Sequence, residues 1–212
     1  MERERDIALI SPERWDVGRA RLATALMIAL AVLSSHAQAE DARPNDDARL
    51  LTARAAIEGL GETLKQQLIA AIKTGGPVSA IGVCRTIAPT ISQEKSRTYG
   101  LEVGRTALKV RNPANAPDAF ERKVLEEFVR KIESGADPAS LEHKETVVEG
   151  GETLFRYMKA IPTAAEPCLA CHGSDLKPEI KAEILRLYPD DRATGFKAGE
   201  LRGAFTVIQK LE

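Results

Sequence analysis

The chain has 212 residues and nearly balanced charge, with 30 lysines and arginines against 31 aspartates and glutamates. This length fits one domain, or two at most, and the absence of a long basic run argues against a nucleic-acid partner. Three cysteines and three histidines limit the metal and redox chemistry available to the chain.

The first forty residues resemble a secretory leader. An uninterrupted apolar run, Leu22–Leu33, is followed by the small-x-small cleavage pattern Ala37–Ala39. The run is shorter than the roughly 20 residues that a membrane-spanning helix needs. We therefore expect a signal peptide of residues 1–39, cleaved after Ala39, and a periplasmic domain of residues 40–212 with no stable membrane span. Because the leader carries as many acids as bases before its apolar run, retention as an anchor stays open.

Three helices follow from local signals. Apolar residues recur at spacings of three and four from about Asp46 to Lys73, which predicts an amphipathic helix that ends at "KTGGP". Pro77 can open a second helix that carries "PVSAIGVCRTIAPTISQ". Asp118 and Glu121 fit a capping box for a third helix, which "NPANAP" precedes and a glycine ends.

The strands are expected mainly in the later part of the chain. "YGLEVGRTALKVR" is strand-like, and "KETVVEGGETLFRYMKAI" predicts a hairpin that turns at Gly150 and Gly151. A short helix over residues 178–188 precedes an alternating tail. The tail is expected to place these residues on one face: Leu201, Phe205, Val207 and Leu211. The order of elements predicts an α+β fold, in which helices pack against a small antiparallel sheet.

"EPCLACHG" carries the strongest chemical signal, in a segment expected to be a loop. Cys168 and Cys171 match the spacing at which two thiols add to the two vinyl groups of one porphyrin. His172 then supplies an imidazole ligand to the iron. This pattern predicts one covalent haem c.

Three other interpretations of the motif are weaker. In an oxidising compartment Cys168 and Cys171 could form a disulfide. A structural zinc ion needs four ligands, and only Cys84 and His143 remain to complete the set. An iron–sulfur cluster needs four cysteines, whereas the chain has three.

The candidates for the second axial ligand are Cys84, His143 and Met158. Met158 lies in the predicted hairpin and fits a strand residue that packs against a helix, while His143 fits an exposed position at a strand entrance. Cys84 lies in an apolar stretch, where a free cysteine is most often a small core residue. A lone thiol in an exported protein also invites a ligand role.

Four blocks carry a resemblance that covers the chain from about residue 50 to its end: "AIGVCRTIAPTIS", "VGRTALKVRNPANAPDAFE", "EPCLACHG" and "YPDDRATGFKAGELRGAFTV". They resemble the signature blocks of a bacterial domain family of unknown function that binds one c-type haem in a PAS-like fold. The resemblance implies a PAS-like antiparallel sheet with a long N-terminal helix. It also implies that Cys84, the cysteine of the first block, is the second axial ligand opposite His172.

Haem would also need partners for its two propionates. Arg105 or Arg111 could bind them bidentately, although a structural bond from either to the neighbouring loop backbone is an equal alternative. No Ser-His-Asp set, phosphate loop or carboxylate pair supports hydrolysis, so we do not expect an enzyme. Only His143 could serve a peroxidase-like reaction.

The expected function is redox sensing, or sensing of a small ligand such as NO or CO, through an unidentified signalling or redox partner protein. The main alternative is a soluble periplasmic electron carrier.

Overall fold

A long helix that reverses direction at two glycines opens the described part of the chain. The computed structural model describes residues 43–211, so the predicted signal peptide lies outside the described residues. Helix α2 (Arg43–Tyr99) leaves helical conformation at Gly75 and Gly76. Gly76 has a φ of 72°, in the left-handed region that glycine adopts without steric penalty. The predicted break between two helices is confirmed, and the second segment continues to Tyr99.

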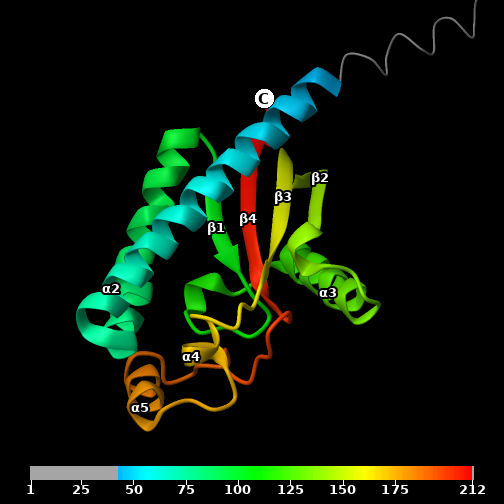
Figure 1. The fold of residues 1–212 in the computed structure, drawn as a ribbon. Helices are drawn as coiled ribbons and strands as arrows, with labels where there is room; N and C mark the ends of the chain where they lie inside the picture. Colours follow the sequence, from blue (N-terminus) through cyan, green and yellow to red (C-terminus); the bar gives the residue numbers. More distant parts are fainter. Residues whose placement is uncertain (1–42, 212) are drawn as a thin grey trace, which may run out of the picture. The chain divides into compact units, whose positions relative to one another are not determined.

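Nine further elements complete the described chain, and Figure 1 shows their arrangement. They are β1 (Glu102–Thr106), η1 (Pro113–Asn115), α3 (Ala119–Glu133), η2 (Pro138–Ser140), β2 (Glu142–Glu149), β3 (Glu152–Pro162), α4 (Leu169–His172), α5 (Pro178–Leu187) and β4 (Leu201–Leu211). The fold is therefore α+β, as the order of elements predicts.

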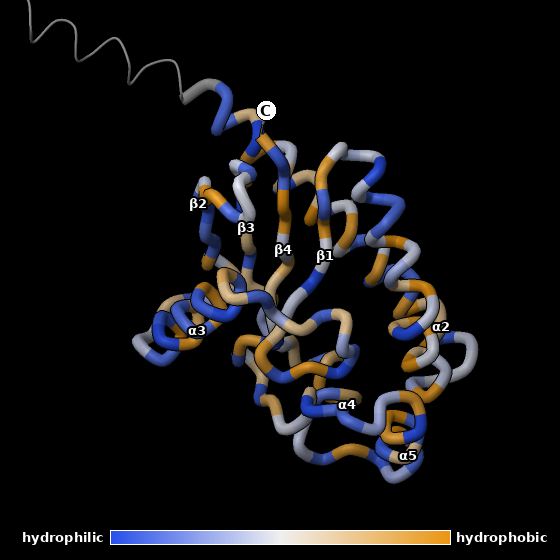
Figure 2. The backbone as a smooth tube through the Cα atoms, turned by 180° about the vertical axis from the view of Figure 1, so that it is seen from behind, coloured by the Kyte–Doolittle hydropathy of each residue, from blue (hydrophilic) through white to orange (hydrophobic). Residues whose placement is uncertain are grey.

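The strands form one open antiparallel sheet in the order β1-β4-β3-β2. The predicted hairpin is confirmed, because Glu149 pairs with Glu152 across Gly150 and Gly151. Both glycines have positive φ, which the tight two-residue turn requires. Strand β4 pairs with β1 on one side and β3 on the other, as Figure 2 shows from behind.

Helices cover the two faces of this sheet. The first segment of α2 packs against one face through a cluster that includes Ala56, Leu60, Phe155, Tyr157 and Val207. Helix α3 packs against the other face through a cluster that includes Val124, Leu125, Phe128, Met158 and Ala204. The predicted capping box begins α3, because the Asp118 carboxylate accepts from Glu121 N while the Glu121 carboxylate accepts from Asp118 N. The loops and short helices that follow β3 lie at one end of the sheet, beyond these two helical layers.

Three details differ from the sequence prediction. Strand β1 is shorter than expected, because Tyr99 still belongs to α2 and Ala107 N donates to Asn115 O outside the sheet. The cysteine motif lies on the single turn of α4 instead of in a loop. Leu201 packs with the α3 cluster and not beside Phe205, because a β-bulge at Ile161/Pro162 interrupts the alternation.

Among the described residues, the helical stretch Asn45–Tyr99 is long and apolar enough, by length and composition, to cross a membrane. An 18-residue window of it is 11% buried. The stretch is broken at Gly75 and Gly76, and each segment contributes buried residues to a core cluster, such as Leu60 and Ile81. The helix of a folded domain passes the same test of composition.

The break in α2 gives a testable pair of substitutions. Gly76→Ala should lower the free energy of unfolding by about 1 kcal/mol, because alanine is strained at this positive φ although the space beside it is open. Gly82→Ala, in the helical second segment and also in open space, should raise it by roughly 0.5 kcal/mol. Urea unfolding of protein purified without a cofactor measures both. Equal effects of the two changes would contradict the assigned break.

Candidate cofactor site

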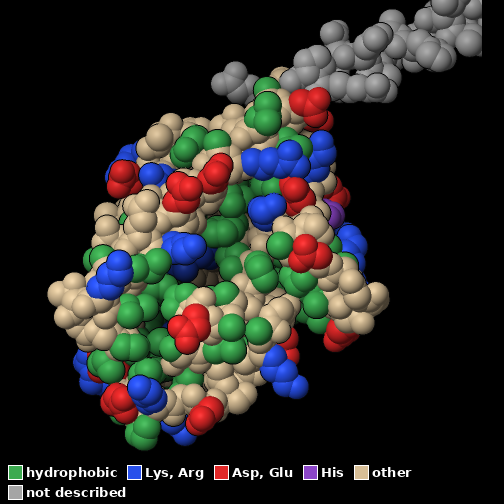
Figure 3. Space-filling model, in the orientation of Figure 1, with side chains coloured by type: hydrophobic (Ala, Val, Ile, Leu, Met, Phe, Trp, Pro, Cys, Tyr) green, Lys and Arg blue, Asp and Glu red, His purple; other side chains and the backbone are tan. Residues whose placement is uncertain are grey.

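A cavity of about 240 Å³ lies between α2, the end of β1 and α4. Figure 3 shows a hollow on the face drawn in Figure 1, with hydrophobic side chains around it and basic side chains at its edge. The sequence-predicted ligand residues all line the cavity: Cys84, Cys168, Cys171 and His172. Two distant stretches of sequence therefore meet at one site.

The walls of this cavity are mainly apolar. Both segments of α2 contribute, and so do the strand ends and the loop after β1. The apolar lining includes Leu68, Ile72, Ala80, Ile81, Val110 and Ile161. Leu68 and Ile72 remain partly exposed to solvent. A flat apolar ligand in the cavity would remove this surface from water, which is favourable.

His172 is held by its ring nitrogen Nδ1, which lies 2.7 Å from the carbonyl oxygen of Ala193. A carbonyl oxygen only accepts hydrogen bonds, so Nδ1 carries the proton and Nε2 keeps its lone pair. Burial is the main cause that lowers the pKa of His172 to about 2, and the positive charges of Arg202 and Arg111 add to it. The ring is therefore a neutral imidazole with one nitrogen able to bind a metal.

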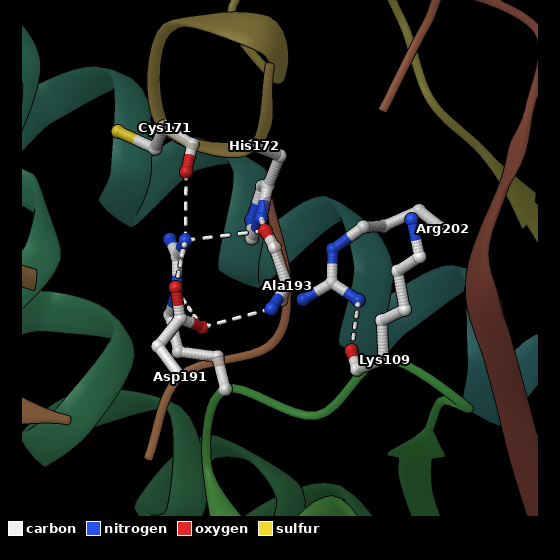
Figure 4. A network of polar contacts seen from close by, with 7 residues as sticks. Lys109, Cys171, His172, Asp191, Ala193 and Arg202 are labelled. Carbon is white, nitrogen blue, oxygen red and sulfur yellow. Dashed lines mark hydrogen bonds and ion pairs between the residues drawn. The ribbon is translucent and has the colours of Figure 1, made fainter. Parts of the chain in front are cut away.

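Arg111 ties α4 to the loop after α5. Its guanidinium forms a buried ion pair with Asp191, with Nε 3.0 Å from Oδ1. Nη2 donates to the carbonyl oxygens of Cys171 at 2.7 Å and Ala193 at 3.2 Å. Figure 4 labels these two acceptors, with Asp191 beside them. The backbone acceptors of Arg111 thus lie on α4 and in the loop after α5, and not in the neighbouring loop considered from the sequence.

Arg105 and Arg202 also line the cavity, and neither forms an ion pair with a carboxylate among the described residues. The Arg105 side chain has no hydrogen bond within residues 43–211 either, and burial lowers its pKa. Arg202 donates to Lys109 O at 3.4 Å and lies over the Phe196 ring. Burial first, then the charges of Arg111 and Arg105, lower the pKa of Arg202 to about 10. The cavity therefore contains two half-buried cations whose charges the anionic groups of a ligand could balance.

The sequence interpretation did not assign a role to Arg202. The sequence signal for such a role was an arginine beside Gly203 at the start of a strand whose first half is otherwise mainly apolar. Regular alternation would direct residue 202 to the α3 face, with Ala204 and Thr206. The bulge at Ile161/Pro162 changes this direction, and its position could not be read from the sequence.

The other two candidates for an axial ligand lie away from the cavity lining. Met158 is fully buried in the α3 cluster, as expected for a strand residue that packs against a helix. His143 lies on β2, where Nε2 is 3.2 Å from the Glu145 carboxylate and the ring meets Phe120 edge-on. His143 is half-buried, whereas an exposed position was expected. Cys84 alone among the three faces the site.

Cys84 lies on the second segment of α2 and is half-buried. Burial raises the pKa of Cys171 against the opposing charge of Arg111, and Cys84, which lines the same cavity, raises it further. All three cysteines are free thiols, so the disulfide alternative is not what the structure shows. Over residues 43–211, no group of three or more His, Cys, Asp or Glu side chains could hold a metal ion alone. The zinc alternative therefore lacks its ligand set.

Comparisons with protein families and with solved structures found similar proteins. The sequence matches the Tll0287-like family over residues 19–209. The crystal structure of the cyanobacterial heme-protein Tll0287 is similar to this chain, with 29% sequence identity and a TM-score of 0.56. The match covers 80% of this chain and 98% of that chain. A search of curated proteins found no match.

The neutral state of His172 makes the stability of the cofactor-free protein depend on pH. Because the folded pKa of about 2 lies below the ordinary value of 6.5, only the unfolded chain binds this proton between those limits. Stability should therefore fall as the pH drops below 6.5, by about 1.4 kcal/mol per pH unit from this residue. Urea unfolding of the wild type and His172→Gln between pH 7 and 4 measures the difference in slope. Parallel profiles would show that His172 is not held neutral.

Proposed function

The chain belongs to the Tll0287-like family, and on this premise we propose that it is an exported protein carrying one covalently attached haem. In this proposal it senses redox state or a small ligand in the periplasm. The similarity to a heme-protein supports the cofactor. The finer description of the fold as PAS-like belongs to the same proposal, since the open antiparallel sheet and long helix are compatible with it.

The residues of the cavity fit a haem in charge and polarity. Arg105 and Arg202 are two half-buried cations without a carboxylate, and haem brings two propionates. The partly exposed apolar surface of Leu68 and Ile72 fits the porphyrin ring. The two unbalanced arginines are the observation that carries the proposal, because neither a disulfide nor a zinc ion would account for them.

Each residue then has a separate task. Cys168 and Cys171 would form the thioether links, and His172 would bind the iron through Nε2 while Ala193 O holds Nδ1–H. Cys84 would be the second protein ligand to the iron. A haem bound here supplies an iron that exchanges one electron and binds small ligands.

Sensing follows from the charge and position of Cys84. A thiolate is an anion and therefore binds ferric iron more strongly than ferrous iron. Cys84 lies on the second segment of α2, whose start packs against α5 through Ile81, Ile180 and Ile184. Further along, the same segment packs against the sheet through Ile91. Loss of the sulfur contact on reduction would free this segment to take a second arrangement that a partner protein can bind. A position would also open for a ligand such as NO or CO.

The alternative of a soluble electron carrier requires that both axial ligands persist in both oxidation states. The peroxidase-like alternative is weakened, because His143 lies on β2 outside the cavity lining. Export is supported by the apolar run that ends before Ala37–Ala39. The partner remains unidentified in this proposal, and no nucleic acid is involved.

Covalent attachment and export can be tested together. Wild-type protein expressed with a cytochrome c maturation system should give a band on a denaturing gel that stains for haem peroxidase activity. The band should come from the periplasmic fraction and begin at Glu40 by N-terminal sequencing. Cys168→Ala with Cys171→Ala should abolish the stain. An unstained wild-type band would contradict the assignment of covalent haem. An uncleaved leader in the membrane fraction would indicate that the leader stays as an anchor.

Ligation by Cys84 separates the sensor from the carrier. Cys84→Ala should keep the haem attached but lose the thiolate-type low-spin ferric signal in electron paramagnetic resonance. Thr86→Ala is a matched control, because Thr86 lies on the same segment and bonds only to Gly82 O. The reduced wild type should bind carbon monoxide readily. If the reduced protein does not bind carbon monoxide, the electron-carrier alternative is favoured. If Cys84→Ala keeps the wild-type ferric signal, Cys84 is not a ligand to the iron.

A further inference from the structure

The backbone carbonyl of Ala193 accepts two hydrogen bonds at once. His172 Nδ1 lies 2.7 Å from this oxygen, and Arg111 Nη2 donates to the same oxygen at 3.2 Å. Arg111 Nη2 also donates to Cys171 O at 2.7 Å. One guanidinium therefore contacts both the turn that carries the histidine and the acceptor that orients its ring (Figure 4).

Asp191 holds this arrangement from the other side. Its carboxylate accepts from Arg111 Nε at 3.0 Å and Nη2 at 3.1 Å, and Oδ1 also accepts from Ala193 N at 3.0 Å. The side chains are 9% and 3% exposed, so solvent screens the two charges weakly. The carbonyl, the cation and the carboxylate form one buried unit behind the imidazole.

We propose that the Arg111–Asp191 pair positions His172 and sets how strongly its imidazole donates electron density to a bound iron. The inference rests on the proposed function, because it needs haem in the cavity. A strong acceptor at Nδ1–H makes a ligating histidine more basic. The Arg111 cation draws on the same carbonyl lone pairs, weakens that acceptor and keeps His172 close to a neutral imidazole. Asp191 opposes the cation and limits this effect.

The two charges should therefore move the reduction potential in opposite directions. Loss of the Arg111 cation strengthens the Nδ1–H bond and removes a positive charge near the iron, so both effects stabilise ferric iron. Loss of the Asp191 anion leaves the cation unopposed and stabilises ferrous iron. A pair that served only as a structural brace would respond differently, because breaking it from either side would loosen the same loop.

The experiment compares haem-loaded Arg111→Gln and Asp191→Asn with the wild type in a spectroscopic reductive titration. Dithionite supplies the one electron that converts ferric to ferrous protein, and the proton stays on His172 Nδ1. At the midpoint potential of the wild type, the ratio of ferric to ferrous protein should be about tenfold higher in Arg111→Gln. In Asp191→Asn the same ratio should be about tenfold lower. Arg186→Gln, which breaks an exposed pair with Glu183 on α5, should leave the ratio unchanged.

The outcomes separate this inference from the proposed function. Shifts of the same sign, or no shift, in variants that stain for covalent haem would overturn the role of the pair and leave the haem assignment standing. A wild type without covalent haem would overturn both. If Arg111→Gln does not fold, Asp191→Asn decides alone, because it keeps the shape of the side chain. Arg111→Lys, which keeps the charge, should then stay close to the wild-type potential.

Discussion

At the end of the sheet where the cavity lies, the Asp191 carboxylate forms a buried ion pair with Arg111. Arg105 and Arg202 lie half-buried at the same cavity, and neither forms an ion pair among the described residues. Buried cations are unfavourable unless they are paired. An anionic ligand in the cavity would balance these charges. Under the proposed function that ligand is haem, with its porphyrin against the apolar walls and its iron near Cys84 and His172.

Burial, and after it the same distribution of charge, explains why His172 is neutral. A histidine beside three guanidinium groups has no carboxylate to favour its protonated form, and the acceptor of its Nδ1–H is a carbonyl. Metal binding requires a neutral imidazole. The arginine charges that would bind propionates therefore also help to keep His172 in its neutral, metal-binding form. Membership of the Tll0287-like family and the geometry of the cavity support the same cofactor from separate observations.

Local features of the fold could be predicted from the sequence, whereas contacts between distant segments could not. The break at Gly76 and the capping box at Asp118 depend on a few neighbouring residues and their backbone preferences. The convergence of Cys84 with the cysteine motif came only from family resemblance, since spacing alone left three candidates. The roles of Asp191 and Arg202 depend on a pairing 80 positions apart and on a bulge, neither of which leaves a local pattern.

The position of β4 in the sheet has a consequence for the order of assembly. This strand is the last element of the described chain, yet it lies between β1 and β3 and is the sole sheet partner of β1. As the chain is synthesised from its N-terminus, β1 has no strand to pair with until β4 emerges. The loop that contacts His172 O through Phe196 N also follows the cysteine motif. Under the proposed function, the thiols of Cys168 and Cys171 would therefore be open to an attachment enzyme until β4 completes the sheet.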